Sequence, residues 1–163
     1  MAAGNYDINA EQGSNFTLYL QYQTGTGASI DLTEYTDARM QVRRSKTATK
    51  KLLELNTVGV TGGGVTGDFT SVPNGLTNGG TYGVGGSGGI KLNTGTGGFT
   101  TDVFGSITGG IYFEISAYTM KDVPIGNHSY DIELVSGSTG ASTSQNSTRI
   151  LQGKFNVDGE VTK

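Results

Sequence analysis

Apolar and polar residues alternate over short runs toward both ends of the chain. A period of two places the apolar side chains on one face of an extended strand, so each run predicts a strand with one buried face. Because each run also keeps a polar face, the pattern predicts antiparallel sheets that turn one side to a common core, as in a β-sandwich. The runs cover residues 15–22, 38–43, 52–55, 111–115, 130–134 and 151–157.

The same alternation assigns single side chains to the core or to the surface. On the polar faces, Arg39, Arg43, Asp131 and Glu133 are predicted to point outward. Residues 116–120 predict a single helical turn, because a serine at the first position can cap it. The predicted inward positions are Phe16, Leu18, Leu20, Tyr22, Ile30, Leu32, Tyr35, Ala38, Met40, Val42, Ile111, Phe113, Ile115, Leu151, Gly153, Phe155 and Val157.

Residues 59–110 differ sharply in composition from the rest of the chain. They hold 19 of the 28 glycines and only three charged residues. A structureless loop of this length is unusual in a compact domain, so we expect one domain, 1–163, with its core from 5–58 and 105–162 and a glycine-rich insertion at 59–104. The insertion has two interpretations: an arm or hairpin ordered chiefly by a neighbouring subunit, or a surface loop. Within it, residues 90–92 could form a short strand.

Composition and charge narrow the classes of partner. Hydrophobic residues make up only 34% of the chain, so we expect a modest core that gains stability from neighbouring subunits. The formal net charge of −3 gives no overall electrostatic footprint for nucleic acid. One basic cluster follows the acidic residues of the segment 31–37, and it predicts either a self-compensating solvated surface or a contact with a neighbouring acidic subunit. The cluster comprises Arg39, Arg43, Arg44, Lys46, Lys50 and Lys51.

Cysteine is absent from the chain, which excludes disulfides, thiolate zinc sites and cysteine nucleophiles. Residues 1–7 lack the apolar run of a signal peptide, and no stretch approaches the roughly 18 apolar residues of a membrane span. We therefore expect a soluble protein made in a cytoplasm, without a membrane partner.

Residue patterns that could carry chemistry are few. Residues 83–88 match the letters of a dinucleotide-binding loop, but the residues that follow do not predict the helix that such a loop requires. The single histidine, His128, is predicted to lie in a turn, and no spacing links it to a nucleophile. Asp31, Glu34 and Asp37 lack the spacing of a calcium loop. No catalytic, cofactor-binding or metal-ligating residue is predicted, and we do not expect an enzyme.

Several segments in order along the chain resemble a family of small bacteriophage virion proteins. The most specific is Ile-Asp-Leu-Thr-Glu-Tyr-Thr-Asp-Ala-Arg-Met-Gln-Val-Arg at 30–43, and the others are 6–8, 11–13, 16–18, 110–119, 130–135, 149–157 and 160–162. The resemblance implies an immunoglobulin-like β-sandwich in a phage particle, similar to the N-terminal domains of baseplate and tail-fibre proteins. The chain departs from the family in the insertion at 59–110 and in a longer loop at 136–147.

Two positions have structural interpretations of their own. Tyr130 stands just before an alternating strand, where its hydroxyl could bond to the backbone as in a tyrosine corner. Gly153 would let two strands or sheets approach closely.

These observations predict a non-enzymatic virion protein that assembles in several copies with itself and with other virion proteins, in the tail, baseplate or neck. One alternative is a capsid decoration protein, also called a cement protein. An alternative of another class is a receptor- or glycan-binding module, which eight tyrosines and polar loops permit although no tryptophan is present.

Overall fold

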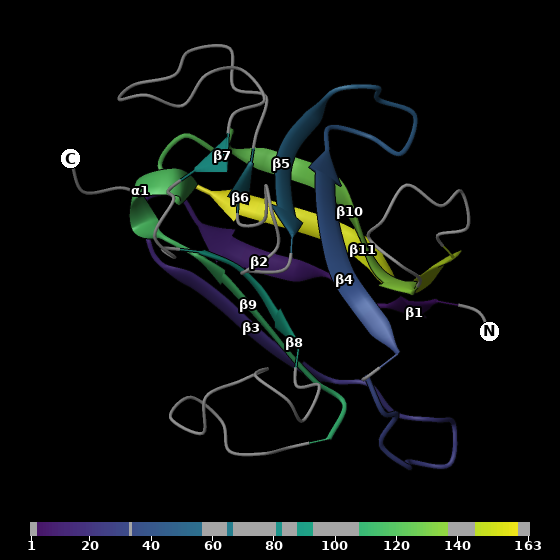
Figure 1. The fold of residues 1–163 in the computed structure, drawn as a ribbon. Coiled ribbons are helices and arrows are strands. Elements are labelled where there is room, and N and C mark those ends of the chain that lie inside the picture. The colour runs from purple at the N-terminus through teal and green to yellow at the C-terminus, as the bar shows by residue number, and fades with distance from the viewer. Residues whose placement is uncertain are drawn as a thin grey trace.

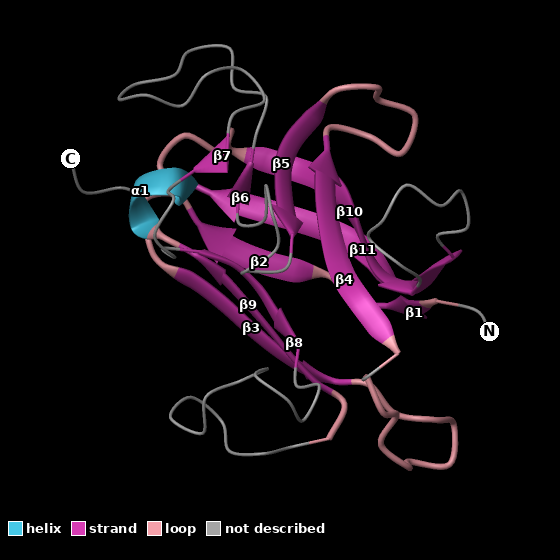
Figure 2. Cartoon of the chain, in the orientation of Figure 1, coloured by secondary structure: helices cyan, strands magenta, loops and turns pink. Residues whose placement is uncertain are grey.

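The computed structural model describes residues 3–32, 34–56, 65–66, 81–82, 88–92, 108–136 and 146–159. Over these ranges the chain consists mainly of β-strands in two sheets (Figure 1). One helical turn, α1 (Ala117–Met120), follows a strand at one end of the sheets (Figure 2). The prediction of an all-β fold is confirmed.

The larger sheet, sheet A, holds the two ends of the described chain side by side. Its strand order is β1-β11-β10-β4-β5-β6-β7, and β2 also pairs with β11. Sheet B has the order β3-β9-β8. The strands of sheet A are β1 (Gly4–Asn5), β2 (Ile8–Glu11), β4 (Tyr35–Arg43), β5 (Lys51–Asn56), β6 (Val65–Thr66), β7 (Thr81–Tyr82), β10 (Gly126–Ser136) and β11 (Asn146–Asp158); those of sheet B are β3 (Phe16–Gln21), β8 (Gly88–Leu92) and β9 (Gly110–Ile115).

The prediction of wholly antiparallel sheets is wrong for the start of the chain. Strands β1 and β2 both run parallel to β11, while the other pairings are antiparallel. Gly4 pairs with Leu151 and Ile8 with Phe155, so the offset to β11 is the same on both sides of the break at Tyr6 and Asp7. Alternation shows only which face of a strand is buried, and it carries no information on the direction of its neighbour.

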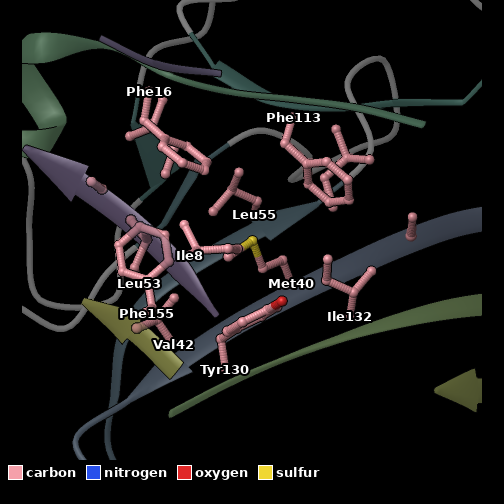
Figure 3. Close-up of a cluster of buried hydrophobic side chains, with 14 of the residues drawn as sticks. Ile8, Phe16, Met40, Val42, Leu53, Leu55, Phe113, Tyr130, Ile132 and Phe155 are labelled. Carbon is pink, nitrogen blue, oxygen red and sulfur yellow. The ribbon is translucent and has the colours of Figure 1, made fainter. Parts of the chain in front are cut away.

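The core lies between the two sheets (Figure 3). Phe16 of sheet B meets Phe155 of sheet A edge to face, with ring centroids 5.5 Å apart. Phe113 and Met40 are fully buried from opposite sheets. Each such side chain contributes about 1.5–3 kcal/mol of hydrophobic free energy, so the interdigitation of these two layers is the main support of the fold.

Strand β3 buries less than its sequence pattern predicts. Phe16 is buried, but Leu18, Leu20 and Tyr22 are only half-buried at the margin of the core. Strand β3 forms an edge of sheet B within the described residues, and side chains on an edge strand are covered from one side only. On β4 and β9 the predicted inward positions are buried except Tyr35, and Leu32, Phe155 and Val157 are buried as well. Tyr35, Ile30 and Leu151 are only half-buried.

The helical turn forms where the sequence predicts it. Ser116 is extended at the N-cap, and its hydroxyl accepts a hydrogen bond from the Thr119 backbone N–H at 3.3 Å. The turn also buries Thr119 and Met120. It closes the end of the core next to β9.

Part of the glycine-rich segment belongs to the sheets. Strand β8 pairs with β9, which confirms a strand at residues 90–92, and Ile90 and Leu92 are buried in the core. Strands β6 and β7 extend sheet A beyond β5. Most of the segment 59–104, like the loop residues 137–145, lies outside the described residues, so the arm and loop interpretations stay predictions.

Gly153 allows a close approach of the N-terminal segment, as predicted. A Cβ atom at this position would overlap the Tyr6 carbonyl oxygen and would lie 2.8 Å from the Tyr6 carbonyl carbon. The backbone N–H of Tyr6 donates to the Gln152 carbonyl at 3.0 Å, and the Asp7 carboxylate accepts from the Lys154 backbone N–H at 2.9 Å. The segment between β1 and β2 therefore lies directly on β11.

Candidate interaction surface

The outer face of sheet A carries four ion pairs between described residues. On β4 the buried residues Ala38, Met40 and Val42 alternate with Arg39, Gln41 and Arg43, which confirms the predicted outward direction of both arginines. Asp131 and Glu133 on β10 share that face, again as predicted. We call this surface the charged face; it comprises Arg39, Gln41, Arg43, Lys51, Glu54, Asp131, Glu133 and Arg149.

Strand register places acids opposite bases on this face. Glu133 on β10 pairs with Arg39 on β4 and with Arg149 on β11. The Glu133 carboxylate lies 3.8 Å from Nη2 of Arg39 and 3.6 Å from Nη2 of Arg149. These separations exceed hydrogen-bond length, and exposed ion pairs of this kind contribute only about 0–1 kcal/mol to stability. These ion pairs therefore set the charge pattern of the face and add little to the stability of the fold.

A β-bulge places Arg149 on the charged face. Strict alternation along β11, counted back from Phe155 through Leu151, would turn Arg149 toward the core. Between Ile132 and Glu133 the pairing shifts, so Ile132 pairs with Leu151 but Glu133 pairs with Arg149. The extra residue of a bulge reverses the side-chain direction beyond it. Nε of Arg149 then lies 3.2 Å from the Asp131 carboxylate.

The Asp131 carboxyl has a pKa raised above its ordinary value. Partial burial on the sheet surface is the main cause, opposed by the neighbouring Arg149 and reinforced by the negative charge of Glu133. Loss of hydration therefore outweighs the attraction of the arginines at this carboxyl.

Arg43 is held by neutral oxygens. Its Nη1 donates to the carbonyls of Ala48 at 2.8 Å and Thr49 at 2.6 Å, in the turn between β4 and β5. Its Nη2 donates to Oε1 of Gln41 at 2.8 Å. The Gln41 amide in turn donates to Glu54, which contacts Lys51. The guanidinium is thus fixed in place. No described carboxylate forms a direct ion pair with it, although its charge helps to lower the pKa of the Asp131 carboxyl.

Beside Arg43 the charged face is hollowed. We call this depression the basic hollow; it is lined by Gln41, Arg43, Lys46, Asp131 and Arg149. On one side it continues to Arg39 and Glu133. Four cationic side chains and two carboxylates line this whole region, so it is locally positive on a chain whose net charge is −3.

The structure divides the basic cluster predicted from the sequence. It brings Arg39, Arg43 and Lys46 together at the hollow, whereas Arg44 and Lys50 are exposed away from it. Arg39 lies near Glu133, and Arg43 acts electrostatically on Asp131, as the interpretation of a self-compensating surface expects. The contact with an acidic subunit stays a prediction. Sequence reasoning missed Arg149, since its position depends on the bulge. The only signal was that alternation would have put an arginine in the core.

The remaining candidate residues form no common site. His128 lies in β10, not in a turn; it is buried, and its Nε2 donates to the Pro124 carbonyl at 2.7 Å. Asp31 and Glu34 are exposed, and the Asp37 carboxylate accepts from the Ala38 backbone N–H. In the ranges that the structure describes, no group of acidic and histidine side chains could hold a metal ion. Residues 83–87 of the glycine motif lie outside those ranges, and Gly88 begins a strand.

Known proteins give no assignment for this surface. No protein-family model matches the chain, and neither does any curated protein sequence. Among the described helices, none has the length and apolarity to cross a bilayer.

Proposed function

We propose that this chain is a non-enzymatic structural protein of a bacteriophage particle, built on an immunoglobulin-like sandwich and assembled with copies of itself and with other virion proteins. The strand order supports the fold. In a variable-type immunoglobulin domain, whose strands are named A to G in chain order with C′ and C″ added after C, one sheet holds G, F, C, C′ and C″ and the other holds A, B, E and D. The orders β11-β10-β4-β5 and β3-β9-β8 fit these two sheets. One departure is that β1 and β2 join β11 in sheet A.

The charged face is the observation that carries the proposed role in assembly. The outward-facing charged side chains of a packed sheet lie at fixed spacings, because the inward-facing side chains that alternate with them are buried and fix the register of each strand. Complementary charge patterns steer partners together and fix their register. The surface joins two residues that are far apart in the sequence, Arg39 and Arg149, through Glu133. Such a surface suits repeated docking against other protein subunits.

The proposed place in the particle rests on the resemblance of residues 30–43 and the other motif segments to small phage virion proteins. We assign the chain to the tail, baseplate or neck, with capsid decoration as the alternative. A receptor- or glycan-binding module is the alternative of another class. Tyr6, the most exposed aromatic residue of the described chain at 54%, is the one side chain that favours it.

Quantitative mass spectrometry of virions separated into heads and tails tests this proposal. The virions are purified from a lysate of cells that carry the genome in which this protein is encoded. Enrichment with tails, in the small multiples that ring symmetry requires, supports a tail, baseplate or neck protein. Enrichment with heads in high copy number supports the decoration protein. Absence from purified particles, together with binding to a glycan array, would overturn the structural role.

A further inference from the structure

We propose that the basic hollow is a binding site for a carboxylate on an acidic segment of a partner protein. This inference rests on the proposed docking role of the charged face and names the chemistry of the partner. It assigns the central contact to Arg43, with Lys46 as the second cation.

The first support is the unused hydrogen-bonding capacity of Arg43. A guanidinium has five N–H donors. Nη1 donates to the Ala48 and Thr49 carbonyls, and Nη2 donates to Gln41. The Nε–H of Arg43 has no hydrogen-bond partner among the described residues, so it remains available to a carboxylate oxygen.

The second support is that no direct ion pair offsets the charges of Arg43 and Lys46, although Arg43 acts electrostatically on the nearby Asp131 carboxylate. The hydrogen bonds of Arg43 go to neutral oxygens, and Lys46 forms no ion pair with any described carboxylate. By contrast, Arg149 lies against Asp131, and Arg39 lies near Glu133. An incoming anion is therefore expected at the Arg43 and Lys46 end of the hollow, away from Glu133.

The third support is pre-organisation. Arg43 is tied to the backbone of the turn between β4 and β5, and that turn also carries Lys46. A side chain already fixed by three hydrogen bonds loses little conformational entropy when it binds a ligand. At the other end of the region, the buried Nε of Arg39 has no hydrogen-bond partner among the described residues. The guanidinium of Arg39 therefore adds positive potential that nearby oxygens do not fully offset.

Charge also favours an acidic protein segment over a nucleic acid. The local surplus of cations spans only the hollow, whereas the whole chain has a net charge of −3. A single carboxylate interacts mainly with charges within about 10 Å at moderate salt. A long polyanion would also meet the acidic remainder of the molecule, which repels it.

A titration of the ¹⁵N-labelled full chain tests the site directly. The probe is a short acetylated and amidated peptide with two glutamates, and its control is the same peptide with glutamines. We expect the glutamate peptide to shift the signals of Arg43, including its side-chain N–H, and of Lys46, and to bind more weakly as salt increases. Equal shifts with the glutamine peptide would overturn the proposal.

Three variants sharpen the test. Lys46→Gln removes an exposed charge and is expected to weaken peptide binding by about threefold to tenfold. Arg43→Lys keeps the charge but loses the Nε–H donor, and it is expected to weaken binding by about tenfold. Arg44→Gln removes a charge one residue from Arg43 but outside the hollow, and it should change affinity by less than about twofold. Equal losses in Lys46→Gln and Arg44→Gln would refute the site.

Two further results separate this inference from the proposed function. If inorganic tripolyphosphate or a short oligonucleotide displaces the glutamate peptide at equal concentration, the assignment to a protein carboxylate is wrong. If Lys46→Gln loses peptide binding but enters virions normally, the hollow is not a docking site, although the virion role stands. A third outcome is that peptide binding depends on Lys46 but purified particles do not contain the protein. That outcome would support the carboxylate site and overturn the virion role.

Discussion

The hydroxyl of Tyr130 donates a hydrogen bond to the backbone carbonyl of Tyr6, across 2.8 Å. Tyr130 is buried in β10, and Tyr6 lies in the break between β1 and β2, directly over Gly153. The hydroxyl does bond to backbone, as the sequence predicts. In a tyrosine corner, however, the acceptor lies a few residues upstream. Here it lies 124 residues away, so the bond connects the start of the chain to the middle of sheet A.

Replacing Tyr130 with phenylalanine should lower the free energy of unfolding by about 1 kcal/mol, because one hydrogen bond is lost and the buried ring is kept. Urea denaturation followed by circular dichroism measures the change. Tyr6→Phe is the matched control: the Tyr6 side chain is 54% exposed and its carbonyl is retained, so stability should not change. Equal effects of the two substitutions would show that the hydrogen bond does not anchor the segment.

The free energy of unfolding should fall at alkaline pH because the phenol of Tyr130 ionises. Burial is the main cause that raises the pKa of the Tyr130 phenol above its ordinary value, with the charges of Asp7 and Tyr6 adding to it. The folded state therefore keeps this proton at a pH where the unfolded chain has released it. The contribution is fully present below about pH 10 and is lost as the pH rises above that, at up to about 1.4 kcal/mol per pH unit.

Denaturation midpoints measured between pH 8 and pH 11, roughly the range that brackets an ordinary phenol, check this expectation. Tyr130→Phe should flatten the alkaline decline without abolishing it, because burial also raises the pKa values of Tyr22 and Tyr112. If the wild type and the variant decline in parallel, Tyr130 is not the residue responsible.

Gly153→Ala should destabilise the protein by about 1–3 kcal/mol, the usual cost of overpacking. The new Cβ would overlap the Tyr6 carbonyl oxygen, and the N-terminal segment would have to move off β11. Faster hydrogen exchange at the Tyr6 amide, which is bonded to Gln152, would report this movement. Gly25→Ala is the control, since no atom lies within 4 Å of its added methyl group. Unchanged exchange in Gly153→Ala would contradict the close approach.

Phe113→Ala and Leu20→Ala should differ in cost, although the sequence predicts both residues to face inward. Phe113 is fully buried, so its loss should cost about 3–5 kcal/mol. Leu20 is half-buried on edge strand β3, and its loss should stay below the roughly 2–5 kcal/mol of a fully buried leucine. Chemical denaturation of both variants measures the difference. Equal losses would mean that the edge of sheet B is covered as well as its centre.

Much of the secondary structure was predictable because the relevant physics is local. Alternation identified β3, β5 and β9 to within one residue at each end, β4 except for its first three residues, and the central parts of β10 and β11. The Ser116 cap followed from side-chain chemistry alone. Each of these features depends on residues within a few positions of one another, so a single sequence contains the information.

The parts that the sequence did not predict depend on pairing between distant strands. Alternation cannot reveal that β1 and β2 lie parallel to β11, that Tyr130 bonds to Tyr6, or that a bulge turns Arg149 onto the charged face. The basic hollow exists because that bulge and the turn after β4 meet beside β10. The sequence by itself determined which residues are extended and which faces are apolar. Only the tertiary structure decided strand direction, register and the charges that meet on the surface, because backbone hydrogen bonds between strands are nearly the same for any side chain.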